Sequence, residues 1–186
     1  MVRLATLADI PAVAAIYDRI HDAEDAGRLT TGWLRGVYPT EQTARAALAA
    51  GDLFVLEKSG QIAAAARINR EQVPVYALVD WKYPAADDEV MVLHTLTVDP
   101  PHSGKGHGRE FLAFYERYAL ENRCPVLRID TNEKNAAARA MYARHGYLES
   151  AILPTVFNGI PGVNLVCMEK RLSQNKPHCE VILISI

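Results

Sequence analysis

The stretch DPPHSGKGHGREF, residues 99–111, places three glycines within five positions, at Gly104, Gly106 and Gly108. An apolar run rich in valine and threonine precedes it, and a segment with helical spacing follows it. In such a strand-to-helix turn, successive backbone N–H groups and the positive end of the helix can bind an anion. The stretch therefore predicts a phosphate-binding loop, with a tight turn that binds nothing as the alternative.

The spacing of the glycines excludes two common nucleotide-binding loops. A Walker A loop needs Ser or Thr after its lysine, but Lys105 is followed by Gly106. In a dinucleotide-binding Gly-x-Gly-x-x-Gly loop counted from Gly104, the third glycine falls on Arg109. Counted from Gly106, it falls on Phe111. The phosphate is therefore expected to belong to another class of ligand.

The composition is that of a globular protein without a metal or nucleic-acid signature. The chain has 186 residues, 49% of them hydrophobic and 23% charged, with a net charge of −2. Such a charge argues against a nucleic-acid partner. Cys124, Cys167 and Cys179 lack metal-ligand spacing and are expected to be reduced thiols, with no metal bound. No signal peptide or membrane span is predicted, so we expect a soluble, cytoplasmic protein with no membrane partner.

Apolar periodicity predicts one domain over residues 1–172, with the order β-α-α-β-β-β-α-β-α-β-β. Thr40 is expected to cap the second helix and Gly51 to end it, and Ser59 and Gly60 are expected to form the turn of a hairpin. The segments 21–40 and 69–88 are predicted to be irregular loops. Strands are expected at 2–5, 53–58, 61–68, 89–98, 125–130, 146–153 and 164–172, and helices at about 9–20, 41–50, 109–123 and 135–145.

A second motif follows the glycine loop by roughly 30 residues. NAAARAMYARHGY, residues 135–147, spaces Asn135, Ala138, Tyr142, Gly146 and Tyr147 as N-x-x-A-x-x-x-Y-x-x-x-G-aromatic. Together with the glycine loop, it resembles the GCN5-related N-acetyltransferase (GNAT) family, whose members bind acetyl-CoA and acylate an amine. The resemblance implies an α/β fold: a mixed, mostly antiparallel sheet of six to seven strands, flanked by helices on both faces.

The resemblance also implies which residues bind acetyl-CoA. Backbone amides of the loop would hold its pyrophosphate, although Ser103 stands where the family has Gln or Arg. Lys105 and Arg109 could add charge at the rim, and the strand Leu96–Val98 would pair with the pantetheine arm. The residues implied are Leu96, Thr97, Val98, Ser103, Gly104, Lys105, Gly106, His107, Gly108, Arg109, Asn135, Ala138 and Tyr142.

Tyr142 matches the general acid of the family. Attack of an amine on a thioester expels a thiolate, and because a thiol has a pKa near ~8.5, protonation of this leaving group helps at neutral pH. For the general base, strand alternation predicts that His94 lies on the same face as Leu96 and Val98. Glu89, acting through a water molecule, is the alternative base.

The sequence predicts the acceptor less sharply. Aromatic residues in the two irregular loops are expected to frame its pocket and, with nearby carboxylates, to hold a cationic amine. A small-molecule amine or an amino acid is therefore expected, and a non-catalytic acyl-CoA sensor is the alternative function, which the departure at Ser103 favours. The predicted pocket residues are Trp33, Tyr38, Tyr76, Trp81 and Tyr83.

The segment 173–186 follows the last expected strand and ends in the apolar sequence EVILISI. It is expected to add a strand to the sheet or to a neighbouring subunit, or to be a simple extension. A homodimer formed through the C-terminal strands is the corresponding hypothesis.

Overall fold

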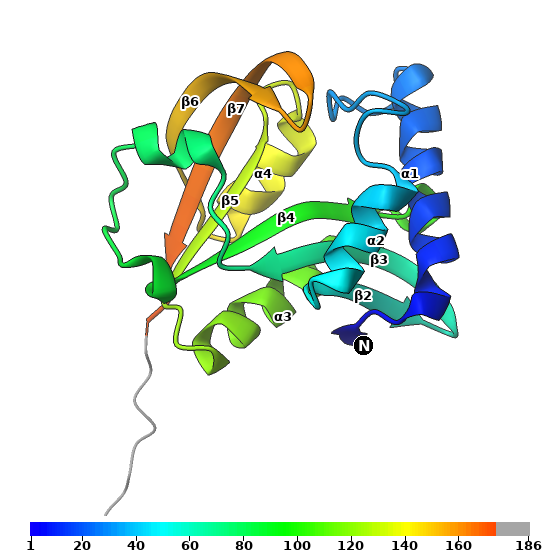
Figure 1. Ribbon diagram of the computed structural model, residues 1–186, viewed down its shortest axis with the longest axis horizontal. Coiled ribbons are helices and arrows are strands. Elements are labelled where there is room, and N and C mark those ends of the chain that lie inside the picture. The colour runs from blue at the N-terminus through cyan, green and yellow to red at the C-terminus, as the bar shows by residue number, and fades with distance from the viewer. Residues whose placement is uncertain (174–186) are drawn as a thin grey trace, which may run out of the picture.

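The computed structural model describes residues 1–173, and its element order is the predicted one (Figure 1). The strands are β1 (Val2–Leu4), β2 (Leu53–Lys58), β3 (Gln61–Asn69), β4 (Val90–Val98), β5 (Val126–Asn132), β6 (Leu148–Phe157) and β7 (Ile160–Arg171). The helices are α1 (Ile10–Asp25), α2 (Glu41–Ala49), α3 (His107–Glu121) and α4 (Ala136–Arg144). Short 3-10 helices are η1 (Leu7–Asp9), η2 (Pro74–Leu78), η3 (Asp87–Glu89) and η4 (Pro100–His102).

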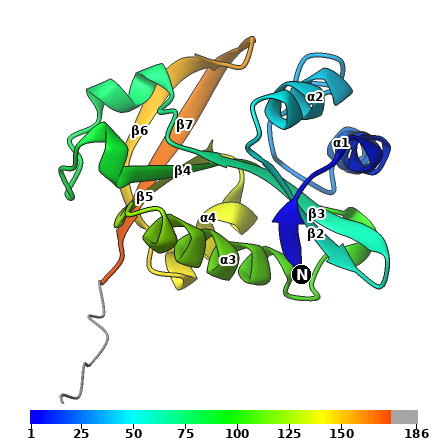
Figure 2. The same ribbon diagram turned by 60° about the horizontal axis from the view of Figure 1, so that its bottom comes forward.

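The seven strands form one mixed sheet in the order β1-β2-β3-β4-β5-β7-β6. Only β4 and β5 run parallel, and every other neighbouring pair is antiparallel. Helices α1 and α2 cover one face, and α3 and α4 cover the other (Figure 2). The predicted fold, a mostly antiparallel sheet with helices on both faces, is confirmed.

Local sequence signals account for most element ends. The Thr43 amide donates to Oγ1 of Thr40 (3.4 Å), so Thr40 caps α2 as predicted. Gly51 follows this helix with a φ of 74°, a conformation in which glycine is favoured. Asn135 caps α4 in the same way, accepting from the Ala138 amide at 3.2 Å. The same cap fixes Asn135 at the start of α4, where it lines the cleft described below.

The two segments expected to be irregular are partly ordered into helix. Helix α1 continues to Asp25, five residues beyond the last apolar position that sequence periodicity identified. The segment after β3 contains η2 and η3. Apolar periodicity does not predict them, because so short a 3-10 helix cannot show a repeating pattern. Within residues 1–173, no helix is long and apolar enough to cross a membrane. The predicted role of 173–186 in strand addition and dimerisation falls almost wholly outside the described residues.

A bulge in the central strand β4 opens the sheet. His94 lies opposite Arg67 of β3, and Thr97 lies opposite Ala65. Two residues of β4, Thr95 and Leu96, therefore face the single β3 residue that lies between Ala65 and Arg67. Thr95 has a φ of 53°, in the left-handed region that threonine rarely adopts. The parallel pairing of β4 with β5 ends at Leu93, directly before this bulge. Beyond that point the two strands are not paired with each other.

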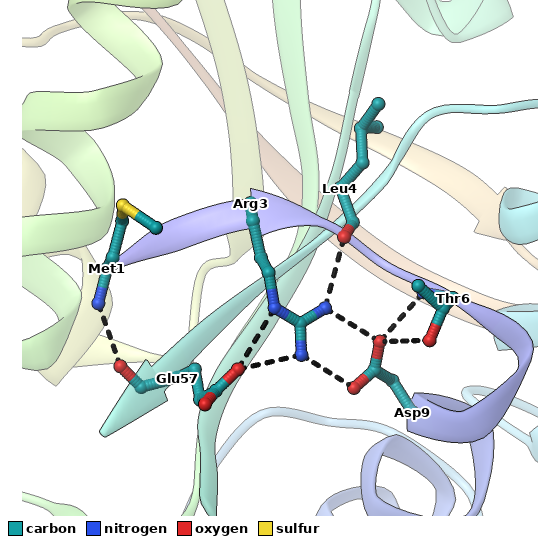
Figure 3. Close-up of polar contacts among 6 residues, drawn as sticks. All are labelled: Met1, Arg3, Leu4, Thr6, Asp9 and Glu57. Atoms are coloured by element: carbon teal, nitrogen blue, oxygen red, sulfur yellow. Dashed lines mark hydrogen bonds and ion pairs between the residues drawn. The ribbon is translucent and has the colours of Figure 1, made fainter. Parts of the chain in front are cut away.

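An ion cluster fastens the N-terminal strand to the first helical turn (Figure 3). The guanidinium of Arg3 donates to both carboxylate oxygens of Asp9 (2.8 and 2.9 Å) and to Glu57 on β2 (3.0 and 2.9 Å). Asp9 also accepts from the Thr6 amide at 2.7 Å. The hydrogen bonds from Arg3, opposed by burial, hold the pKa of Asp9 at about 2, below its usual 3.8.

Replacing Asp9 should therefore destabilise the fold in a pH-dependent way. Asp9→Asn should lower the free energy of unfolding by about 1–3 kcal/mol at neutral pH, since it leaves Arg3 partly unpaired. Because the folded-state pKa is depressed, the ionised carboxylate stabilises the protein above pH ~4, and this contribution disappears as the pH falls towards 2. Urea titrations of both proteins at several pH values measure the difference.

The matched control is Asp22→Asn, because Asp22 pairs with Arg35 at 2.7 Å but is exposed. An exposed pair contributes little, so this variant should lose less than about 1 kcal/mol. Equal losses for the two variants, or a difference that does not shrink in acid, would contradict this account of the cluster.

Candidate active site

A cleft of about 540 Å³ lies where β4 and β5 diverge. Its walls are the bulged half of β4, the end of β5, the start of α3, helix α4, the loop after α1 and parts of β6 and β7. Because β4 loses its neighbour after Leu93, the edge from Thr95 to Val98 that faces β5 has no strand partner within the described sheet. An extended ligand can pair with such an edge.

The glycine loop forms one end of the cleft, and its glycines serve different purposes. Gly104 and Gly106 have φ values of 75° and 84°, so both need the left-handed conformation. A Cβ at Gly104 would meet nothing within 4 Å, which leaves open space beside the backbone. At Gly108, in contrast, a Cβ would lie 2.9 Å from Sδ of Met141 on α4. A side chain at Gly108 would therefore displace the end of the Met141 side chain, whereas Gly104 has open space beside it.

The loop can present an anion-binding surface to the cleft. Gly106 directly precedes α3, a helix of 15 residues. The free N–H groups and the positive dipole end at the start of such a helix favour the binding of an anion. The amide of Ser103 is not available, because it donates to the Pro100 carbonyl at 3.1 Å, so Ser103 can contribute only its hydroxyl. Arg109 lines the cleft as expected, while Lys105 does not. These features fit the pyrophosphate of coenzyme A.

The second motif forms the facing wall. Asn135, Ala138 and Tyr142 of the α4 segment all line the cleft, together with Leu96 and Val98 of β4. The Tyr142 ring is buried, and burial, with a smaller contribution from the Asp130 carboxylate, raises its pKa above the usual 10.0. Tyr142 is therefore fully protonated at neutral pH and can donate a proton into the cleft.

The prediction that His94 shares a face with Leu96 and Val98 is wrong. Simple alternation fails because the bulge at Thr95 inserts one residue. Leu96 and Val98 pack with the core beneath α3, whereas Val92, two residues before His94, belongs to the core on the other face. Nε2 of His94 lies 3.0 Å from Oδ1 of Asn69, and burial lowers the pKa of this imidazole to about 4.

The remaining predicted residues divide between the cleft and other places. Trp33 and Tyr38 line the cleft. Tyr76, Trp81 and Tyr83 do not line it, although they belong to the same hydrophobic cluster as Trp33 and Tyr38; the rings of Tyr76 and Trp81 lie 5.2 Å apart. Glu89 lies in η3 at the opposite end of β4, exposed, and accepts from the Ala86 amide at 3.2 Å. Glu89 is therefore too far from the cleft to act there as the base.

A second pocket of about 240 Å³ adjoins the cleft. Tyr38, Thr95, Asp130 and Phe157 line both cavities, so these residues stand at the junction between them. The hydroxyls of Tyr38 and Thr95 are hydrogen-bonded to each other there. His94 lines the second pocket and not the cleft.

Asp130, at the end of β5, is the residue that sequence reasoning missed. Its Oδ2 accepts a hydrogen bond from the Tyr76 hydroxyl at 2.8 Å. Burial raises the pKa of this carboxyl to about 6, from the usual 3.8, and the Tyr76 bond opposes that increase. Only the register of β5 against β4 brings Asp130 to the junction, and no motif in the sequence marks it. Among the described residues, no group of His, Cys, Asp and Glu side chains could hold a metal ion.

Comparison with known families identifies the same region. The model of the acetyltransferase (GNAT) family matches residues 16–147, which include the bulged strand, the glycine loop and Tyr142. Among curated protein sequences, none matches at a significant level.

Solved structures of similar fold cover nearly the whole chain. A GNAT-family acetyltransferase from Streptococcus agalactiae aligns with a TM-score of 0.78 at 20% identity, over 94% of this chain and 96% of that one. A ribosomal-protein-alanine N-acetyltransferase from Brucella melitensis aligns with a TM-score of 0.67 at 25% identity, over 92% and 99%. The Salmonella typhimurium protein yncA, solved with its cofactor acetyl-CoA, gives 0.66 at 21%, over 95% of each chain.

If the glycine loop binds acetyl-CoA, a substitution in it should weaken cofactor binding in addition to lowering the stability of the fold. Gly106→Ala should cost about 1–2 kcal/mol of stability, because alanine is strained at a φ of 84°, and should weaken acetyl-CoA binding tenfold or more. Calorimetric titration with acetyl-CoA and thermal unfolding measure the two effects.

Gly60→Ala is the control, since Gly60 has a similar φ of 75° with open space around it but lies in the β2–β3 turn. It should lose comparable stability and keep its acetyl-CoA affinity. Equal affinity losses in both variants would mean that the glycine loop does not bind the cofactor.

Proposed function

Since this chain belongs to the GNAT family of acetyltransferases, we propose that it transfers an acetyl group from acetyl-CoA directly to the primary amine of a small molecule. Acetyl-CoA is the cofactor of this family and supplies the acetyl group as an activated thioester. The observation that carries the proposal is the convergence on one cleft of the anion-binding loop, the unpaired edge of β4 and the hydroxyl-bearing ring of Tyr142.

Each part of the cleft has a distinct task in this reaction. The amides from Gly104 to Gly108 and the start of α3 bind the pyrophosphate, and Arg109 adds positive charge. The unpaired edge of β4 orients the pantetheine arm, while Asn135 and Ala138 close the other side. This arrangement fixes the thioester near the bulge, so that the acceptor amine needs only to reach that point.

Tyr142 protonates the leaving group. Its raised pKa keeps the hydroxyl protonated at neutral pH, and the departing thiolate, whose thiol has a pKa near ~8.5, is favourably protonated at that pH. The tyrosine therefore gives its proton to the departing sulfur and recovers one from the reacting amine.

The buried cysteines support direct transfer over a covalent acyl-enzyme. Cys124 and Cys167 are fully buried, and neither lines the cleft. Burial raises the pKa of Cys167 to about 12, so this thiol is not a nucleophile at neutral pH. Within residues 1–173, therefore, neither cysteine is placed to form an acyl-enzyme, which favours direct attack of the amine on the thioester.

Two alternatives remain distinguishable by experiment. The Brucella melitensis structure is that of a ribosomal-protein-alanine N-acetyltransferase, so a protein N-terminus is an alternative acceptor. The absence of Gln or Arg at Ser103 favours a non-catalytic acyl-CoA sensor. A small-molecule acceptor is proposed because Trp33 and Tyr38 line the cleft and offer aromatic surface against which a compact cationic amine can pack.

Tyr142→Phe tests the proposed chemistry. It should lower kcat about 100-fold or more, because general acid catalysis is lost, and should leave the dissociation constant of acetyl-CoA within about twofold. Release of the CoA thiol, followed with a thiol reagent over a panel of amines, gives the rates, and calorimetry gives the affinity.

Tyr147→Phe is the matched control. This neighbouring tyrosine is buried with its ring packed 5.9 Å from that of Tyr142, but it does not line the cleft. Its kcat should stay near that of the unchanged protein. Binding of acetyl-CoA without turnover of any amine in the unchanged protein would support the sensor instead.

A further inference from the structure

The second pocket is a cavity of its own that shares a wall with the cleft. Its walls come from α1, α2, β2, β3, β4, β5 and the β6–β7 turn, so it lies on the face of the sheet covered by α1 and α2. The glycine loop does not reach it. A molecule in this pocket would meet the cleft at Thr95 and Asp130, which line both cavities.

The charges of this pocket favour a cation. Arg67 is its positive group, but its guanidinium is already engaged by Asp52 (2.9 Å) and by Glu71 (2.9 Å). His94 is neutral at physiological pH, because its pKa is about 4. The carboxylates therefore outnumber the cations, and Asp130 has no cationic partner within salt-bridge distance among the described residues. These carboxylates would repel a ligand that carries a carboxylate of its own.

The rest of the lining is mainly apolar, apart from Thr43, Thr95 and Asn158, and the pocket is small. Tyr17, Leu53, Val73 and Phe157 supply most of the hydrophobic wall. A volume of about 240 Å³ accommodates a compact molecule with an aromatic or aliphatic body, below the usual range for drug-sized ligands.

From this arrangement we infer that the second pocket binds the acceptor, a compact cationic primary amine that carries no carboxylate, and that Asp130 accepts a proton from its ammonium group. The inference rests on the proposed acetyl transfer and adds to it the substrate class and the proton acceptor. Asp130 takes the role that sequence reasoning gave to His94 or Glu89.

The protons balance with the groups present. The ammonium gives one proton to the Asp130 carboxylate, and the freed lone pair forms the carbon–nitrogen bond to the acetyl carbon as the carbon–sulfur bond breaks. Tyr142 protonates the departing thiolate. The nitrogen, on becoming an amide, loses a second proton, which restores the Tyr142 hydroxyl. Asp130 then releases its proton to water, so the products are the amide, the CoA thiol and one proton.

The groups around Asp130 determine its titration. Tyr76 from η2 donates to it, and Tyr38 and Tyr142 face it as neutral hydroxyls, because burial raises both of their pKa values. Cys167 on β7 lies directly opposite in the sheet and is also neutral. A cationic acceptor would therefore supply the positive charge that is missing beside Asp130. An acidic limb near pH 6 is expected for Asp130, whereas a limb near 4 would point to His94.

A matched pair of acceptors tests the substrate class. Phenethylamine and phenylalanine differ only by the carboxylate beside the amine. With acetyl-CoA, kcat/KM for phenethylamine should exceed that for phenylalanine by about 100-fold or more, and a short peptide should react no faster than phenylalanine. Preference for phenylalanine or for the peptide would overturn the inference while leaving the acetyltransferase assignment intact.

Two variants test Asp130 independently of substrate choice. Asp130→Asn should lower kcat/KM for phenethylamine about 100-fold or more and remove the limb near pH 6, whereas the exposed Asp18→Asn should change neither. Tyr76→Phe should keep much of the rate at high pH but shift the limb upwards, because the bond that lowers the pKa of Asp130 is lost. A merely structural role would leave the limb in place.

A readout without acetyl-CoA separates the two levels of the proposal. In the free protein labelled with carboxyl-¹³C aspartate, one resonance should titrate near pH 6, disappear in Asp130→Asn and move to higher pH in Tyr76→Phe. An Asp130 resonance that titrates near pH 4 would overturn the inference, even if amines are acetylated. Acetylation of no amine, with the resonance near 6 intact, would instead contradict the proposed function.

Discussion

The left-handed backbone at Thr95 is the constraint on which the site depends. It places two residues of β4 opposite one of β3 and turns β4 away from β5 directly after their last parallel pair. A threonine in this conformation costs on the order of 1 kcal/mol, and the surrounding sheet must hold it there. Its hydroxyl is tied to that of Tyr38, which comes from the loop between α1 and α2. Without the bulge, pairing would continue along both strands and close the cleft.

The same divergence explains why two cavities meet where the chemistry is proposed. The cleft lies between the separated strands and ends at the glycine loop, and the second pocket reaches the separation from the face covered by α1 and α2. Asp130 and Tyr142 approach the junction from β5 and α4, and burial, with a smaller contribution from the Asp130 carboxylate, raises the pKa of the tyrosine. One group holds a proton at neutral pH and the other can receive one. Environment, and not residue type alone, separates their roles.

Features encoded within a short stretch were predictable, and those that depend on distant pairing were not. The glycine loop and the motif from Asn135 to Tyr142 combine local spacing with helix geometry, so the cleft residues on α3 and α4 followed from the sequence. His94 was assigned to the wrong face because a bulge leaves no reliable mark in an apolar strand. No local motif predicts Asp130, because its position depends on the register of β5, and no sequence pattern shows that the Tyr76 hydroxyl donates to it.

A crystal structure of the protein with acetyl-CoA tests the central claim most directly, namely that the separation of β4 from β5 is the acetyl-transfer site. The account predicts the pyrophosphate on the amides between Gly104 and Gly108, the pantetheine arm along Thr95–Val98 and the thioester between Tyr142 and Asp130. Acetyl-CoA bound elsewhere, or β4 and β5 paired along their whole length beside an empty cleft, would contradict it.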